Sequence, residues 1–173
     1  MKKETNTAST TLYLLRHGET EENAAGIFQG QRPGHLSLRG KQQAQARHGE
    51  VTSMHFDAIL CSDLQRCKDT AAIVLQGSNA TPIYTPLLRE RDMGNLTGMR
   101  IAGTPLNETV ENAEQVATRA RAFLRLVEET YKGQTLLVIS HGYFCRILQA
   151  VIEQKSYREV PKMENCELRR IVV

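Results

Sequence analysis

Aromatic residues and excess charge are both scarce in this 173-residue chain. It has no Trp, four Phe and five Tyr, so few rings are available for stacking on nucleic-acid bases. Its 22 Lys and Arg residues outnumber its 19 Asp and Glu residues by a net charge of only +3. Such a small excess, spread along the chain, is unlike the concentrated basic surface of a nucleic-acid-binding protein. We therefore expect no nucleic-acid partner.

Long hydrophobic runs are also missing. No segment approaches the ~18 apolar residues that a membrane helix needs. Residues 1–10 are polar and lack the apolar stretch of ~7–15 residues found in a secretory signal. These absences predict a cytoplasmic protein without a membrane partner. They also favour a flexible N-terminal tail over 1–10 and a single domain over 11–173.

The cysteines of the chain do not follow a metal-binding or disulfide motif. The four Cys residues are scattered and form no Cys-x-x-Cys pair, so they indicate free thiols rather than a disulfide framework or a zinc site. Hydrophobic residues make up 40% of the chain and charged residues 24%, which is ordinary for a globular domain. A chain of this length can therefore build its own core.

Apolar runs alternate with helical patterns along the chain. The apolar runs predict buried strands at 12–15, 57–61 and 135–139, a short strand at 82–85 and a further edge strand within 166–173. The helical patterns predict helices at 38–54, 64–75, 108–131 and 142–152. Ser62 and Asp63 are expected to cap the second of these helices. Such alternation predicts a three-layer α/β/α sandwich with a mostly parallel central sheet and helices on both faces.

Polar motifs follow three of the predicted strands. They are Arg16-His17-Gly18, Ser62-Asp63 with Arg66 nearby, and Ser140-His141-Gly142. Ligands of open parallel sheets bind beyond the carboxyl ends of the strands, so these motifs should face one crevice. Arginine forks match phosphate oxygens in geometry and charge, and the helix that starts after His141 adds positive potential. The crevice is therefore expected to bind a phosphate group.

These motifs resemble those of the histidine phosphatase superfamily, also called the phosphoglycerate mutase-like family. The similarity runs in the family's order through four segments, Leu14–Thr20, Ser62–Arg66, Leu88–Glu90 and Ser140–Gly142. Asn23, Gln29 and Gly30 fit the same pattern between the first two. A lone Arg-His-Gly would be weak evidence, whereas four ordered segments are specific.

The resemblance implies a metal-independent phosphatase that needs no cofactor. His17 would attack phosphorus and form a phosphohistidine, which water then hydrolyses. Arg16, Arg66 and His141 would hold the phosphate oxygens. Glu90 would be the general acid and base, with a pKa raised toward neutrality. The other residues that the resemblance places in substrate binding are Asn23, Gln29, Gly30 and Gly142.

The chain also departs from the family pattern. Glu22 stands where the family usually has an aromatic residue, and only twelve residues separate Gly98 from Glu111. Family members with mutase activity have a longer cap with extra basic residues there, so the shortened cap favours hydrolysis over mutase activity. The Glu19-Thr20 pair resembles the branch that contains alpha-ribazole phosphate and sugar phosphate phosphatases. We therefore expect a small phosphomonoester substrate, such as a nucleoside or sugar phosphate, and a monomer or homodimer.

Other functions remain open at this point. The shortened cap also resembles the compact branch that acts on phosphohistidine in proteins. A regulatory domain could retain the phosphate pocket without turnover. A zinc site of His17, His141 and Glu90 is a third possibility, which the two pocket arginines disfavour by charge repulsion. Arg119, Arg121 and Arg125 are expected to form a solvated helix face, and the segment 108–112 carries no assigned role.

Overall fold

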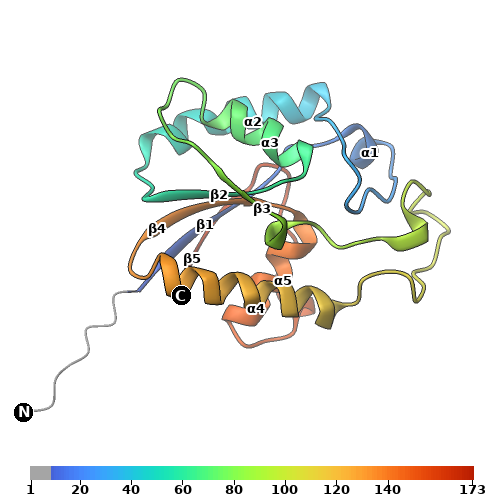
Figure 1. Ribbon diagram of the computed structural model, residues 1–173. Coiled ribbons are helices and arrows are strands. Elements are labelled where there is room, and N and C mark those ends of the chain that lie inside the picture. The colour runs from blue at the N-terminus through green and yellow to red at the C-terminus, as the bar shows by residue number, and fades with distance from the viewer. Residues whose placement is uncertain (1–8) are drawn as a thin grey trace, which may run out of the picture.

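The computed structural model describes residues 9–173, and a five-stranded sheet lies at their centre (Figure 1). The strand order is β3-β2-β4-β1-β5. Four strands are mutually parallel, and β5 runs antiparallel to β1. The strands are β1 (Thr11–Arg16), β2 (Ala58–Ser62), β3 (Ile83–Thr85), β4 (Thr135–Ser140) and β5 (Leu168–Val172).

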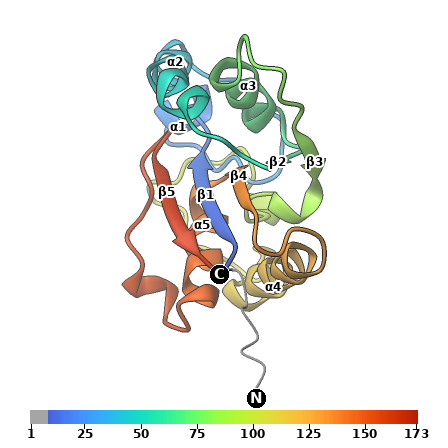
Figure 2. The same ribbon diagram turned by 90° about the vertical axis from the view of Figure 1, so that its left-hand side faces the viewer.

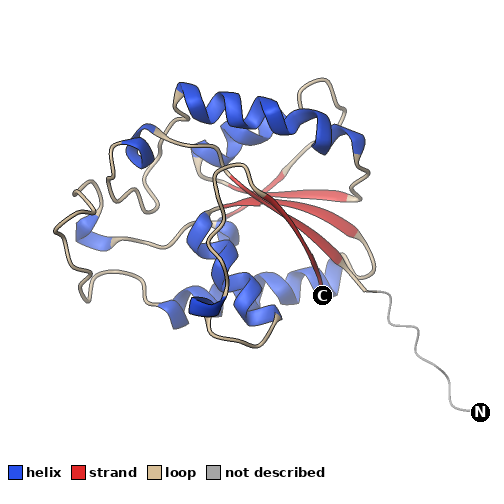
Figure 3. Ribbon diagram, turned by 180° about the vertical axis from the view of Figure 1, so that it is seen from behind, coloured by secondary structure: helices blue, strands red, loops and turns tan. Residues whose placement is uncertain are grey.

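Helices cover both faces of this sheet. One layer contains α2 (Leu38–Ser53) and α3 (Gln65–Val74), and the other contains α4 (Ala113–Thr130) and α5 (Gly142–Ile152). Figure 3 shows the strands between the two helical layers. The short elements are α1 (Glu21–Ala24) and the 3-10 helices η1 (Pro86–Leu88), η2 (Gly94–Leu96) and η3 (Tyr157–Glu159). The predicted three-layer α/β/α fold is confirmed.

The central strand β4 is apolar at every inner position because both of its faces are covered. Leu136 and Val138 pack in the cluster that contains α4 and α5. Leu137 and Ile139 pack in the cluster that contains α2 and α3. Each such buried side chain contributes about 1.5–3 kcal/mol through the hydrophobic effect. This double burial fixes the strand ends that carry the polar motifs.

One predicted helix cap and one predicted helix start are wrong. Asp63 does not cap α3, because its carboxylate accepts two hydrogen bonds from Arg89 at 2.7 and 2.6 Å. Ser62 is also no helix cap, since α3 has no side-chain cap hydrogen bond. The helix predicted from 108 begins at Ala113, because the Asn112 side chain accepts a hydrogen bond from the Gln115 amide and forms a capping box.

The C-terminal strand β5 forms the edge of the sheet beside β1, as expected for the tail (Figure 2). Thr10 continues this pairing, because its backbone exchanges two hydrogen bonds with Val173. The rest of the predicted flexible tail, residues 1–8, lies outside the described residues. All four cysteines are free and buried. Within residues 9–173, no helix is long and apolar enough to cross a membrane.

Candidate active site

The motif residues meet at the carboxyl ends of β1, β2 and β4. Arg16 and Ser140 are paired neighbours in β1 and β4, so the residues that follow them are brought together. The ring centroids of His17 and His141 are 5.1 Å apart. A cavity of about 250 Å³ opens over this point. Its lining includes seven of the predicted site residues, namely Arg16, His17, Asn23, Gln29, Gly30, Arg66 and Glu90.

His17 is held as a neutral imidazole with one free nitrogen. Its Nδ1 lies 2.7 Å from the Gly18 carbonyl oxygen, which can only accept, so Nδ1 donates and Nε2 keeps its lone pair. Burial lowers the pKa of His17 well below its usual range, and the charges of Arg66 and Arg16 lower it further. A neutral imidazole with a free Nε2 is the form that can attack an electrophile.

Arg16 supplies a hydrogen-bond donor without a partner. Its Nη1 donates to the Met163 carbonyl at 2.6 Å, whereas its buried Nε has no hydrogen-bond partner within residues 9–173. A buried unpaired donor is costly, and an anion in the cavity would satisfy it. The absence of a side chain at Gly142 keeps space free beside this nitrogen, because a Cβ at that position would stand 3.0 Å from Arg16 Nε.

Arg66 is almost fully buried, with 1% of its surface exposed. Its guanidinium donates to the carbonyls of Gly30 at 2.7 Å and Arg32 at 3.0 Å, and its Nε donates to His141 Nδ1 at 3.2 Å. These contacts occupy three of the five N–H groups of an arginine. Arg66 also lines the cavity, so its charge would attract an anion there.

His141 lies behind the cavity rather than in its lining. It is completely buried, its Nδ1 accepts from Arg66, and its Nε2 lies 2.8 Å from Ser62 Oγ. Burial and the charge of Arg66 lower its pKa well below the usual range. In this arrangement His141 orients Arg66 and packs against His17. A direct contact between His141 and phosphate stays a prediction.

Glu90 reaches the cavity from a segment without regular structure. Its carboxyl group accepts hydrogen bonds from the backbone amides of Tyr143 at 3.2 Å and Phe144 at 3.1 Å, in the first turn of α5. Helix N-termini present such unpaired amides to acceptors. The structure therefore brings Glu90 to the same cavity as Arg16 and His17.

The loop between α1 and α2 is tied by its Gln29 side chain to helix α1 and to Thr20, the residue that caps this helix. The Asn23 side chain accepts from the Thr20 amide, and Thr20 Oγ1 donates to the Gln29 side chain at 3.0 Å. Gln29 in turn donates to Glu22 at 3.1 Å. Glu22, which departs from the family pattern, therefore serves to orient Gln29 in the cavity lining.

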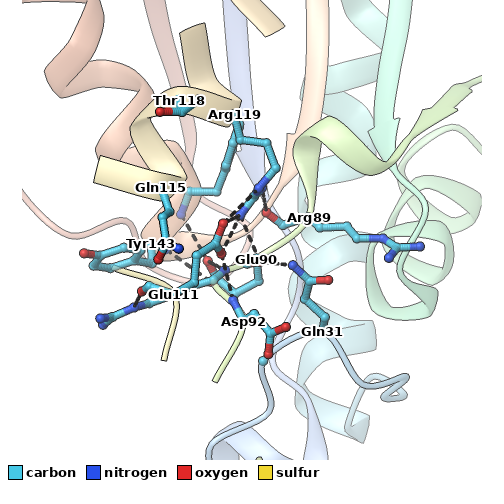
Figure 4. A network of polar contacts seen from close by, with 12 residues as sticks. Gln31, Arg89, Glu90, Asp92, Glu111, Gln115, Thr118, Arg119 and Tyr143 are labelled. Atoms are coloured by element: carbon cyan, nitrogen blue, oxygen red, sulfur yellow. Dashed lines mark hydrogen bonds and ion pairs between the residues drawn. The ribbon is translucent and has the colours of Figure 1, made fainter. Parts of the chain in front are cut away.

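The expected solvated face of Arg119, Arg121 and Arg125 is wrong in part. Arg121 and Arg125 are exposed, but the Arg119 side chain is only 18% exposed and pairs with Glu111 at 2.8 Å. It also donates to the backbone carbonyls of Arg89 and Glu90 (Figure 4). The segment 108–112 thus contributes a structural partner.

Apolar residues form the outer part of the cavity lining. Phe28, Met93, Ile101, Leu106 and Tyr143 contribute to it, and Ile101 and Leu106 are about half exposed at 50% and 51%. Sequence reasoning missed these residues, because all but Tyr143 of helix α5 lie in loops without a recognisable pattern. We call Phe28, Ile101 and Leu106 the apolar rim.

The geometry also bears on the zinc alternative. Within residues 9–173, no group of three or more His, Cys, Asp or Glu side chains could hold a metal ion. His17, His141 and Glu90 therefore do not form such a group. The donors that converge on the cavity are N–H groups, which suit an anion.

The fold and the site agree with comparisons to known proteins. Residues 12–173 match the family described as histidine phosphatase superfamily (branch 1), and the chain belongs to this family. It is 31% identical over 148 residues to the adenosylcobalamin/alpha-ribazole phosphatase of Escherichia coli, which covers 75% of this chain and 72% of that protein. It is 33% identical over 179 residues to the "probable phosphoglycerate mutase GpmB" of Proteus mirabilis, which covers 92% and 83%.

A solved structure of a named phosphatase is also similar to this chain. The alpha-ribazole phosphatase of Shigella flexneri superposes with a TM-score of 0.81 at 26% sequence identity, over 92% of this chain and 89% of that chain. The predicted family is confirmed, and the chain is a phosphatase of the histidine phosphatase superfamily.

Proposed function

We propose that the protein hydrolyses a small-molecule phosphomonoester without a metal ion, through a phosphohistidine on His17. The observation that carries the proposal is the state of His17. Its Nδ1 donates to the Gly18 carbonyl, which leaves Nε2 as a nucleophile. The cavity is also lined by Arg16, whose buried Nε has no partner within residues 9–173.

Hydrolysis then takes two displacements. In the first, His17 Nε2 bonds to phosphorus and the bond to the alcohol oxygen breaks, while the protonated Glu90 carboxyl gives that oxygen its proton. In the second, the Glu90 carboxylate takes a proton from a water molecule whose oxygen attacks phosphorus. The phosphorus–nitrogen bond breaks, inorganic phosphate leaves and His17 is regenerated. Arg16 and Arg66 neutralise the charge on the phosphate oxygens in both steps.

The apolar rim supports an alcohol with an apolar face. The phosphate group would lie against Arg16 and Arg66, and the ester's alcohol would extend toward Ile101 and Leu106. Such contacts suit a nucleoside or another flat alcohol better than one that is polar all round. A cavity of about 250 Å³ is of a size for a small molecule, which favours such a substrate over a phosphoprotein.

Hydrolysis is favoured over mutase activity in this proposal. The cap segment 99–110 contains one basic residue, Arg100. A mutase must retain a second phosphate group and shield the phosphohistidine from water. We therefore expect free phosphate as the product.

The test is hydrolysis of p-nitrophenyl phosphate by the wild type and by His17→Ala, each with and without excess EDTA. We expect wild-type activity that survives EDTA and at least a ~10³-fold loss in the variant, because the covalent nucleophile is gone. A panel of nucleoside phosphates, sugar phosphates and a phosphohistidine peptide then ranks the substrates. Activity that persists in His17→Ala, or that disappears with EDTA, would overturn the proposal.

A further inference from the structure

The segment that carries Glu90 is attached to helix α4 through one arginine. Residues 89–93 form no helix or strand. Arg119 of α4 donates from Nη1 to the carbonyls of Arg89 at 2.6 Å and Leu87 at 3.3 Å, and from Nη2 to the Glu90 carbonyl at 3.3 Å. Figure 4 shows these contacts converging on the backbone around Glu90.

Glu111 completes the attachment from the other side. Its carboxylate accepts from Arg119 Nη2 at 2.8 Å and Nε at 3.2 Å. The same carboxylate accepts the Asp92 amide at 2.9 Å, and the Glu111 carbonyl accepts Arg91 Nε at 2.6 Å. The pair therefore holds the residues on both sides of Glu90.

The environment of this pair makes its contacts strong. The side chains of Arg119 and Glu111 are only 18% and 16% exposed, so water screens them less than surface charges. Hydrogen bonds with a charged partner are roughly twice as strong as neutral ones. The Arg119 guanidinium also lies 5.2 Å from the ring centroid of Phe144, whose backbone amide donates to the Glu90 carboxyl. The backbone of Glu90 thus contacts Arg119, and its carboxyl group contacts Phe144, whose ring packs against Arg119.

We propose that Arg119 and Glu111 form an ion-pair clamp that positions Glu90 for proton transfer to the leaving oxygen. This inference rests on the proposed function. Neither residue lines the cavity, so both are positioning residues and not catalytic ones. Loss of the clamp should weaken protonation of the leaving group and leave phosphate binding by Arg16 and Arg66 intact.

The test compares two substrates that differ in their need for protonation. An aryl ester such as p-nitrophenyl phosphate has a stable leaving anion, whereas a simple alkyl phosphate needs a proton on its leaving oxygen. The ratio kcat/KM reports only the steps up to phosphoryl transfer to His17, so it isolates this difference. In Arg119→Met we expect kcat/KM to fall at least ~10-fold more for the alkyl ester, which is part of the ~10²–10⁴ that a general acid contributes.

Three further variants sharpen the test. Glu111→Gln keeps the shape of the side chain and removes its charge, and it should give the same selective loss to a smaller extent. Glu90→Gln should show the selective pattern at its largest. Arg121→Met is the matched control, because Arg121 lies on the same helix, is exposed and pairs with Glu114. It should leave both substrates unchanged.

The outcomes separate the clamp from the proposed function. Equal losses for both esters in Arg119→Met and Glu111→Gln, or no loss in either, would overturn the clamp. If thermal unfolding shows that Arg119→Met does not fold, Glu111→Gln decides the question alone. Full activity in His17→Ala would instead remove the proposed function itself, whatever the clamp variants do.

Discussion

Two regions of the cavity are held in place by different forces. The floor consists of Arg16, His17 and Arg66, with His141 directly behind it. These residues lie on strand ends and on the first turn of a helix that packs in the core. The wall, residues 89–112, contains only the short helix η2. It is held by side-chain contacts to backbone, such as Arg119 to the Arg89 carbonyl.

The difference assigns distinct tasks to the two regions. Hydrogen-bonded strand register and core packing hold the floor, so its geometry changes little with substrate. The wall is held in part by the largely buried Arg119–Glu111 ion pair, and it carries both Glu90 and part of the apolar rim. We therefore expect changes in the floor to affect every phosphate ester alike, and changes in the wall to discriminate between esters.

Arg66→Met should have the largest effect of the variants that probe this comparison. It removes the hydrogen bonds that Arg66 donates to the Gly30 and Arg32 carbonyls and to His141 Nδ1. It also removes the positive charge on the cavity floor. We expect kcat/KM to fall ~10²–10³-fold for aryl and alkyl phosphates alike. Steady-state kinetics on both esters measure this, with Arg66→Lys as the control that keeps charge but loses the planar fork. A loss confined to alkyl esters would contradict the division between floor and wall.

A matched pair of glycines in α2 tests the packing under the floor. A Cβ on Gly40 would stand 2.0 Å from the Glu19 carbonyl oxygen, whereas a Cβ on Gly49 would meet no atom within 4 Å. We expect Gly40→Ala to lower the free energy of unfolding by about 1–3 kcal/mol. Gly49→Ala should raise it by up to about 1 kcal/mol, because alanine favours helix. Thermal unfolding checks both signs, and a shift in the same direction for both variants would refute this packing.

Stability should also decline in mild acid because of the two buried histidines, His17 and His141. Burial lowers the pKa of His17 and of His141 well below 6.5 in the folded state, so the unfolded chain binds protons first as the pH falls. Their contribution to stability is therefore full above about pH 6.5 and is lost below it. We expect a lower Tm at about pH 5.5 than at about pH 7.5. His141→Gln should reduce that difference, and an equal difference in this variant would exclude His141 as a source.

The smallest effect is expected at the apolar rim. Ile101 and Leu106 are about half exposed, so their replacement should not disturb folding. Ile101→Ser and Leu106→Ser should each raise KM for an aryl phosphate by about three- to tenfold, because each removes part of an apolar contact. The KM for glycerol phosphate is the internal control. If both esters changed equally, the rim would have no part in selecting the alcohol.

The sequence predicted the floor much better than the wall, and the reason is physical. His17 and His141 directly follow strands, and the uninterrupted apolar run at 135–139 is typical of a strand buried on both faces. Local pattern therefore located them. The partners of Arg119 lie 30 residues away at Arg89 and 29 away at Glu90, and no local pattern links such positions.

Side-chain partners from distant segments also make contacts that the sequence does not show. Asp63 is of a residue type that commonly caps helices, but its carboxylate pairs with Arg89 instead. His141 follows its strand as predicted, yet Ser62 and Arg66 occupy both of its ring nitrogens. At both positions the partner comes from a segment that is distant in the sequence. Only the three-dimensional arrangement therefore shows which contact forms.

The phosphohistidine itself is the most direct test of the account. The enzyme would be mixed with a radiolabelled phosphate ester and quenched in alkali, in which a phosphorus–nitrogen bond survives. Mass spectrometry would then locate the phosphoryl group. We predict label on the peptide that contains His17, at Nε2, and no label in His17→Ala. Turnover without any labelled intermediate, or label on another residue, would contradict the central claim that His17 is the nucleophile.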